Sequence, residues 1–191
     1  FGILDVVQVF LEFGADVNAK LNARAVTPLE LLLQKAPFFG PSRVGVLDAL
    51  LNANAETGAS ALYAVANLHV PFEVLMTLIK KGADVNARVS DVQQNISPLQ
   101  LAIRMNRTGH VVVLLAAPAI DVNLKDGLGH SALFTALLHG APIPILRKLL
   151  EQSTESTAMV LSQADAARLE QGEPPVEDDA RQILEAHGAT F

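Results

Sequence analysis

Apolar residues recur at spacings of three and four along most of this chain, which is the pattern of amphipathic helices. One apolar stripe occupies residues 132–139, and a second runs to about Gln152. A polar, Gly-containing stretch at 123–130 precedes the first stripe, and residues 140–142 separate the two. The pattern therefore predicts a turn followed by two short helices, a pair too small to bury its apolar stripes alone.

Residues suited to begin and end helices occupy matching places in several such pairs. Ser131 stands at an N-cap position, and Pro28 and Pro98 follow the equivalent cap at the first helical position, where a missing N–H is harmless. The residue that ends the second helix should adopt a left-handed conformation, which suits Gly best and Asn next. This position is held by Gly14, Asn54, Gly82 and Gly188.

Two short phrases recur in the same order along the chain. Gly-Ala-Asp-Val-Asn-Ala occupies residues 14–19 and 82–87, with an altered copy at 119–123. A second phrase, which opens a helix, begins at residues 27, 60, 97 and 131, at spacings of 33, 37 and 34. Recurrence at a fixed period indicates a repeat array, in which each helix pair buries its apolar stripes against its neighbours.

Together the two phrases resemble the ankyrin repeat, a motif of about 33 residues. Its Gly-x-Thr-Pro-Leu-His opening is similar to residues 129–134, and its Leu-Leu-x-x-Gly-Ala-Asp-Val-Asn close is similar to residues 78–86. The resemblance covers about residues 3–153. It implies an all-α, ankyrin-type helical solenoid of stacked helix–turn–helix repeats with short hairpin loops. We place the array at 1–153, with a half repeat at 3–19 and repeat openings at 27, 60, 97 and 131.

The final residues, 154–191, fit the motif less well. Residues 157–160 resemble a worn repeat opening, and residues 179–189 resemble a second helix and its close. From Glu151 onward the chain has nine acidic and two basic residues, whereas residues 1–150 have eleven acidic and twelve basic ones. We expect an acidic, degenerate capping repeat at 154–191 that shields the last apolar face from water. The alternative is a partly disordered tail.

No repeat opening keeps the His of the family motif. In the family this ring ties adjacent loops together, so the resemblance implies weaker ordering between neighbouring repeats here. The position is held by Glu30, Tyr63, Gln100 and Phe134. A further departure is the insertion of residues 37–41 between the two helices of one repeat.

Composition and charge exclude several classes of protein. The 191 residues are half hydrophobic and include no Cys, which rules out disulfides and thiolate metal sites. The near-neutral array lacks the broad basic face of a nucleic-acid binder. The longest apolar run, 111–120, is interrupted by Pro118 and is too short to span a bilayer. The five His are scattered without metal-ligand spacing. We expect an intracellular protein, cytoplasmic or nuclear, that is not an enzyme and has no catalytic residue, metal or cofactor.

The resemblance implies a non-catalytic protein–protein interaction module or scaffold, because ankyrin arrays usually bind proteins through hairpin tips and the concave helix face. Lys20, Arg88 and Lys125 each lie two residues after the Asn of the repeated phrase, and Arg24 lies in the first of these loops. Stacked repeats would align these cations as a ladder for an acidic segment of a partner. The alternative is that the cations serve solubility only.

Aromatic residues form a second set of candidate partner contacts. Phe38 and Phe39 lie between two prolines in the inserted segment, where they are either an exposed anchor for a partner or folded back over a helix edge. Tyr63 and Phe134, which replace the motif's His, are either partner contacts or buried spacers.

The chain begins at Phe1, within a helical pattern and without an initiator Met, so we expect it to be part of a longer protein. The alternative to a partner-binding module is an intramolecular role, in which the array packs against or inhibits another domain. That domain could be an enzyme whose catalytic part lies outside this sequence. A purely structural spacer is the remaining alternative.

Overall fold

The computed structural model describes residues 2–20, 26–35, 40–60, 64, 69–88, 95–171 and 174–187. Over these residues it contains ten α-helices and no β-strand, so the fold is all-α, as the apolar periodicity predicts. The chain forms two compact units, Phe1–Ala87 and Arg88–Phe191.

The first unit packs around its third helix. Its helices are α1 (Ile3–Glu12), α2 (Pro28–Lys35), α3 (Pro41–Asn52) and α5 (Phe72–Lys80). Helix α3 packs against both α1 and α2. A Cβ atom at Gly45 would lie only 2.8 Å from Leu4 Cδ2, so glycine lets α1 approach α3 closely. Leu29, Leu33 and Leu47 are fully buried and form part of the core of this unit.

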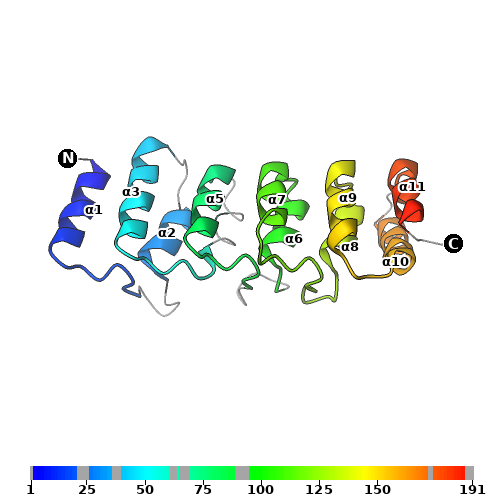
Figure 1. Cartoon of the computed structure of the whole chain (residues 1–191), viewed down its shortest axis with the longest axis horizontal. Coiled ribbons are helices and arrows are strands. Elements are labelled where there is room, and N and C mark those ends of the chain that lie inside the picture. Colours follow the sequence, from blue (N-terminus) through cyan, green and yellow to red (C-terminus); the bar gives the residue numbers. More distant parts are fainter. Residues whose placement is uncertain are drawn as a thin grey trace. The chain divides into compact units, whose positions relative to one another are not determined.

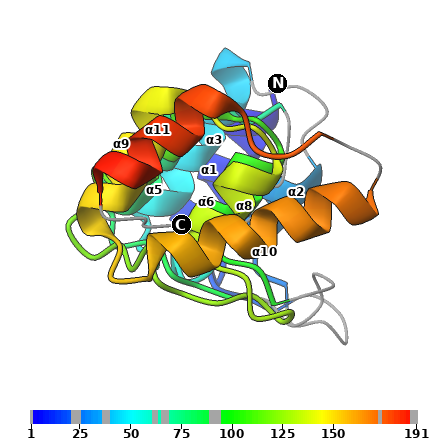
Figure 2. The ribbon, with the colours of Figure 1, turned by 90° about the vertical axis from the view of Figure 1, so that its right-hand side faces the viewer.

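The second unit is built from three helix pairs. They are α6 (Pro98–Arg104) with α7 (Thr108–Leu115), α8 (Ala132–Leu138) with α9 (Ile143–Gln152), and α10 (Thr157–Glu170) with α11 (Asp178–Ala186). The two helices of each pair pack on one another. In addition, α8 packs between α6 and α10, and α9 packs between α7 and α11 (Figure 1). The unit therefore has two layers, and Figure 2 shows α10 and α11 with α8 behind α10.

This unit extends across the predicted boundary at 153/154. Helices α10 and α11 both lie after that boundary, yet α10 packs on α8 and α11 packs on α9. The side chains of Val160, Leu161 and Leu184 are almost completely buried. The division into an array and a capping repeat remains a prediction.

The helices of the repeat openings start where the sequence predicts. The hydroxyl of Ser131 accepts a hydrogen bond from the Phe134 N–H at 3.2 Å, so Ser131 is the N-cap of α8. Pro28 and Pro98 are the first residues of α2 and α6. Both predictions are confirmed, and the reason is local, since a cap satisfies N–H groups within one turn of itself.

Two of these helices start with a reciprocal pair of hydrogen bonds. In α6 the Gln100 N–H donates to Ser97 Oγ at 3.3 Å, and the Ser97 N–H donates to Gln100 Oε1 at 3.0 Å. Thr27 and Glu30 form the same pair at the start of α2, with the same two distances. This capping box fixes the direction from which each loop enters its helix.

The predicted left-handed residues end the second helices. Gly14, Asn54 and Gly82 have φ angles of +78°, +62° and +89°, while Gly188 lies outside the described residues. After α5 the Gly82 N–H donates to the Ile79 carbonyl and the Ala83 N–H to the Leu78 carbonyl, both at 3.0 Å. This is a Schellman motif, and it turns the chain from α5 into the following loop, as the equivalent bonds do after α1 and α3.

Candidate functional site

The loops that follow α1, α5 and α7 contain the repeated Asp-Val-Asn phrase, which has one local structure in all three copies. In each copy the Asp carboxylate accepts a hydrogen bond of 2.9 Å from the N–H of the Asn two residues later. The three acceptors are Asp16, Asp84 and Asp121. Such an Asx turn presents the Asn side chain at a fixed position, from which it can reach a neighbouring loop.

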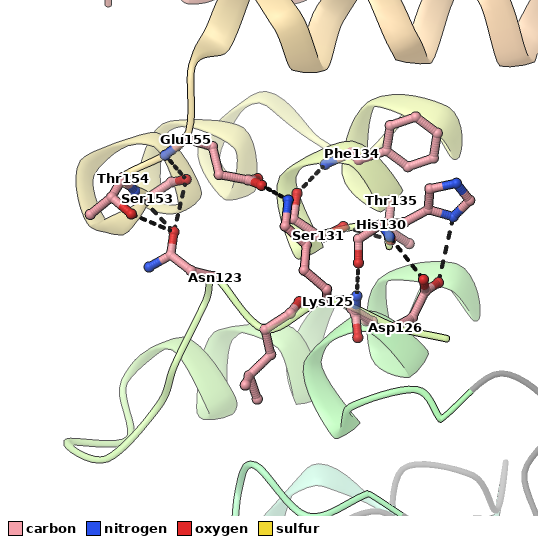
Figure 3. A network of polar contacts seen from close by, with 12 residues as sticks. Asn123, Lys125, Asp126, His130, Ser131, Phe134, Thr135, Ser153, Thr154 and Glu155 are labelled. Carbon is pink, nitrogen blue, oxygen red and sulfur yellow. Dashed lines mark hydrogen bonds and ion pairs between the residues drawn. The ribbon is translucent and has the colours of Figure 1, made fainter. Parts of the chain in front are cut away.

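In two copies the Asn joins its own loop to the loop after the next second helix. The side chain of Asn18 accepts from the Glu56 N–H at 2.8 Å and donates to the Asn54 carbonyl at 3.4 Å. The Asn123 Oδ1 accepts from the Thr154 N–H at 2.9 Å, as Figure 3 shows. It also accepts from the hydroxyls of Ser153 and Thr154, both at 3.3 Å. The loops are thus cross-linked by the same residue of the phrase.

The loop before α8 is held in shape by Asp126. Its Oδ1 accepts from the N–H groups of Leu128 and His130, at 2.8 and 2.9 Å, and its own N–H donates to the His130 carbonyl at 2.9 Å. Gly129, with φ of +85°, provides the turn. These bonds leave Leu128 at the tip of the loop with 61% of its surface exposed.

Gln100 fills the place of the motif's His and joins α6 to this same loop. Its buried amide donates to the His130 carbonyl at 2.6 Å and to the Leu124 carbonyl at 3.3 Å. An amide donor thus replaces the ring at this position, and the weaker ordering between neighbouring repeats stays a prediction. Phe134 is buried and stacks on the His130 ring at 4.1 Å between centroids, so it acts as a spacer.

Lys125 forms an ion pair with Glu155, which follows α9 by three residues (Figure 3). The Lys125 side chain is half exposed, whereas only 9% of the Glu155 side chain is exposed. The pair adds a second cross-link between the loops that Asn123 joins. A partner carboxylate at Lys125 would have to compete with Glu155.

The predicted partner-binding residues fall into three groups. Lys20 and Arg88 are exposed and form no ion pair with a described residue. Lys125 is paired within the chain. The remaining candidates, Arg24, Phe38, Phe39 and Tyr63, lie outside the described residues.

Sequence reasoning missed two features of these loops. Glu155 is separated from Lys125 by 30 residues and belongs to the tail, so no local pattern marks it as a partner. Leu128 is an apolar residue between two glycines of a polar stretch, and this position is the only sequence signal for its exposure.

The described part of the chain has no group of three or more His, Asp or Glu placed to hold a metal ion. None of its helices is both long and apolar enough to cross a membrane. Burial lowers the pKa of the Arg107 guanidinium from its ordinary value. The polar groups around the loop that precedes α8 pair mainly with one another and with backbone.

No protein-family model matches this chain, and no curated protein sequence matches it with significance.

Proposed function

We propose that this chain is an ankyrin-type repeat array that acts as a non-catalytic protein-interaction module. It would bind a partner through the loops that follow its second helices, together with the adjacent first helices. The layered packing of α6, α8 and α10 beside α7, α9 and α11 supports this proposal, because stacked helix pairs give each repeat contacts to its neighbours only.

One observation carries the proposal. The position two residues after the Asn of the repeated phrase holds an exposed cation, Lys20 in one copy and Arg88 in another, and an Asx turn precedes each of them. A turn that is fixed before binding lowers the entropy loss on association, which suits this segment to recognition. The partner segment would be acidic, and its association would depend on salt.

The test compares three forms of the 191-residue chain as baits for partner capture at low salt. They are the wild type, the loop variant Lys20→Glu/Arg88→Glu, and the control variant Arg147→Glu/Lys148→Glu. The control reverses two exposed charges on α9, so its net charge changes by the same amount. Equal helicity of the three baits is checked by circular dichroism.

We expect the wild type and the control to retain the same proteins and the loop variant to lose them. These proteins should elute as the NaCl concentration is raised. Retention of the same proteins by the loop variant would show that the loops do not bind them. Cross-linking followed by mass spectrometry would then identify the surface that does. Capture of no protein by any bait would favour the intramolecular role.

A further inference from the structure

Two pairs of loops are joined by the same hydrogen bond, one pair in each compact unit. In the second unit the Asn123 Oδ1 accepts from the Thr154 N–H at 2.9 Å. In the first unit the Asn18 side-chain oxygen accepts from the Glu56 N–H at 2.8 Å. In both units an Asx turn with an N···O distance of 2.9 Å positions the Asn that accepts this bond. Residues at equal distances along the chain from this bond can therefore be compared.

The comparison shows a lysine in both units and a carboxylate in only one. In the second unit Lys125, two residues after the Asn, pairs with Glu155, the residue that follows the bonded N–H of Thr154 (Figure 3). In the first unit the equivalent lysine is Lys20, and the residue that follows the bonded N–H is Thr57. The position that supplies a carboxylate in the second unit therefore supplies a neutral side chain in the first.

The first unit does not provide this carboxylate from another part of its sequence. Every Asp and Glu of residues 1–87 lies among the described residues, and none of them, Glu56 included, forms an ion pair with Lys20. Lys20 is exposed and Thr57 is half-buried. A carboxylate that completes the arrangement at Lys20 therefore has to come from outside the first unit.

The pair in the second unit indicates the chemistry of the group that fits. Only 9% of the Glu155 side chain is exposed, whereas 49% of the Lys125 side chain is. A carboxylate shielded from water in this way attracts a cation more strongly than one on an open surface does. At the equivalent place in the first unit, the Thr57 hydroxyl can also donate a hydrogen bond to a carboxylate. The ligand that matches both groups is the side chain of an Asp or a Glu.

We propose that Lys20 and Thr57 together bind one Asp or Glu side chain of the partner's acidic segment. This side chain takes the place that Glu155 takes beside Lys125 in the second unit. The inference rests on the proposed function and makes it more specific, because it adds Thr57 to the binding site. It also separates the two lysines, since Lys20 is open to the partner whereas Lys125 already holds a carboxylate of its own chain.

The first test supplies the missing carboxylate from within the chain by the change Thr57→Glu. We expect the introduced carboxylate to pair with Lys20, so the midpoint of urea unfolding at low salt should be higher than in Thr57→Gln, the neutral variant of the same size. Adding Lys20→Met to both variants should abolish this difference. Equal midpoints of the two variants, or a difference that persists without Lys20, would show that the loops do not bring the two positions together, which overturns the proposal.

The second test measures binding of a blocked, fluorescently labelled peptide of alternating Glu and Gly, with a Gln and Gly peptide as control. Fluorescence anisotropy follows each peptide as the 191-residue chain is added at low salt. We expect saturable binding of the acidic peptide only. Thr57→Glu should weaken it about fivefold or more, because the introduced carboxylate competes for Lys20, and Thr57→Gln less than about twofold. Gln182→Glu, at an exposed position of α11, adds the same charge elsewhere and should also weaken it less than about twofold.

Three results of the peptide experiment would overturn the proposal. They are a lack of saturable binding to the wild type, equal weakening by Thr57→Glu and Thr57→Gln, and equal weakening by Thr57→Glu and Gln182→Glu.

Partner capture distinguishes this inference from the proposed function. Proteins that the Lys20→Glu/Arg88→Glu bait loses and a Thr57→Glu bait retains would overturn the inference and leave the proposed function standing. Proteins that the Lys20→Glu/Arg88→Glu bait retains would contradict the proposed function, whereas the pairing of Lys20 with the introduced carboxylate would still be measured by urea unfolding.

Discussion

Lys125 and Glu155 lie 30 residues apart and form an ion pair between the loop before α8 and the loop after α9. The carboxylate is the more buried partner, and its Oε2 is buried without a hydrogen bond to any described residue. A predicted partner-binding cation is therefore also a structural residue. Binding studies that alter Lys125 need a stability measurement beside them, because both properties respond to the same change.

Lys125→Met should destabilise the second unit, because it leaves the buried Glu155 carboxylate without its cation while keeping the apolar stem. We expect a loss of about 1–3 kcal/mol in the free energy of unfolding. Urea denaturation measures it, and a double-mutant cycle with Glu155→Gln isolates the coupling between the two residues. Lys148→Met on α9 is the control and should change stability by less than about 0.5 kcal/mol. If the effects of the two single changes add up in the double variant, the ion pair contributes nothing to the free energy of unfolding.

Asn123→Ala should loosen the loop after α9, because the Thr154 N–H loses its acceptor. We expect a loss of about 1 kcal/mol, as for a typical hydrogen bond or helix cap. Amide hydrogen exchange measured by NMR should accelerate at Thr154 and leave Glu56 unchanged. Asn18→Ala should accelerate exchange at Glu56 and leave Thr154 unchanged, since Asn18 accepts from the Glu56 N–H. Unchanged exchange at both amides would contradict the cross-linking role of this Asn.

Gly82→Ala should destabilise the first unit through its backbone alone. Gly82 has φ of +89°, and an added Cβ would meet no atom within 4 Å, so no steric clash contributes. A left-handed conformation costs a residue with a Cβ about 1–2 kcal/mol. Gly82→Asn should cost less, since Asn54 adopts the same conformation at the end of α3. Thermal unfolding compares the variants, and equal stability of the Ala and Asn forms would contradict this account.

Gln100→Met should disturb the loop before α8 as well as the start of α6, the helix that contains Gln100. It removes the Gln100 partner of the Ser97 N–H and of the Leu124 carbonyl, while the His130 carbonyl keeps its bond from the Asp126 N–H. We expect a loss of about 1–3 kcal/mol. Glu30→Met is the matched control, because Glu30 accepts the equivalent N–H bond from Thr27, and it should cost only about 1 kcal/mol. Equal losses in the two variants would show that the loop contacts of Gln100 add nothing.

The sequence by itself determined where the described helices of the repeat openings begin and how the second helices end. Ser131 caps its helix, and Gly14, Asn54 and Gly82 end theirs, as their types and positions predict. These features depend on hydrogen bonds and backbone angles within about one helical turn, so the local sequence contains the whole cause. The all-α class follows in the same way from the spacing of apolar residues.

Only the tertiary structure decided which side chains meet between loops and which side chains the described residues leave exposed. The bonds of Asn123 to Thr154, of Lys125 to Glu155 and of Gln100 to His130 join residues about one repeat apart, and they depend on how the helix pairs stack. The apolar pattern of α1 is like that of the buried helices, so the sequence cannot show that the described residues bury none of its side chains. Burial depends on a neighbour, and a neighbour is a property of the packed structure.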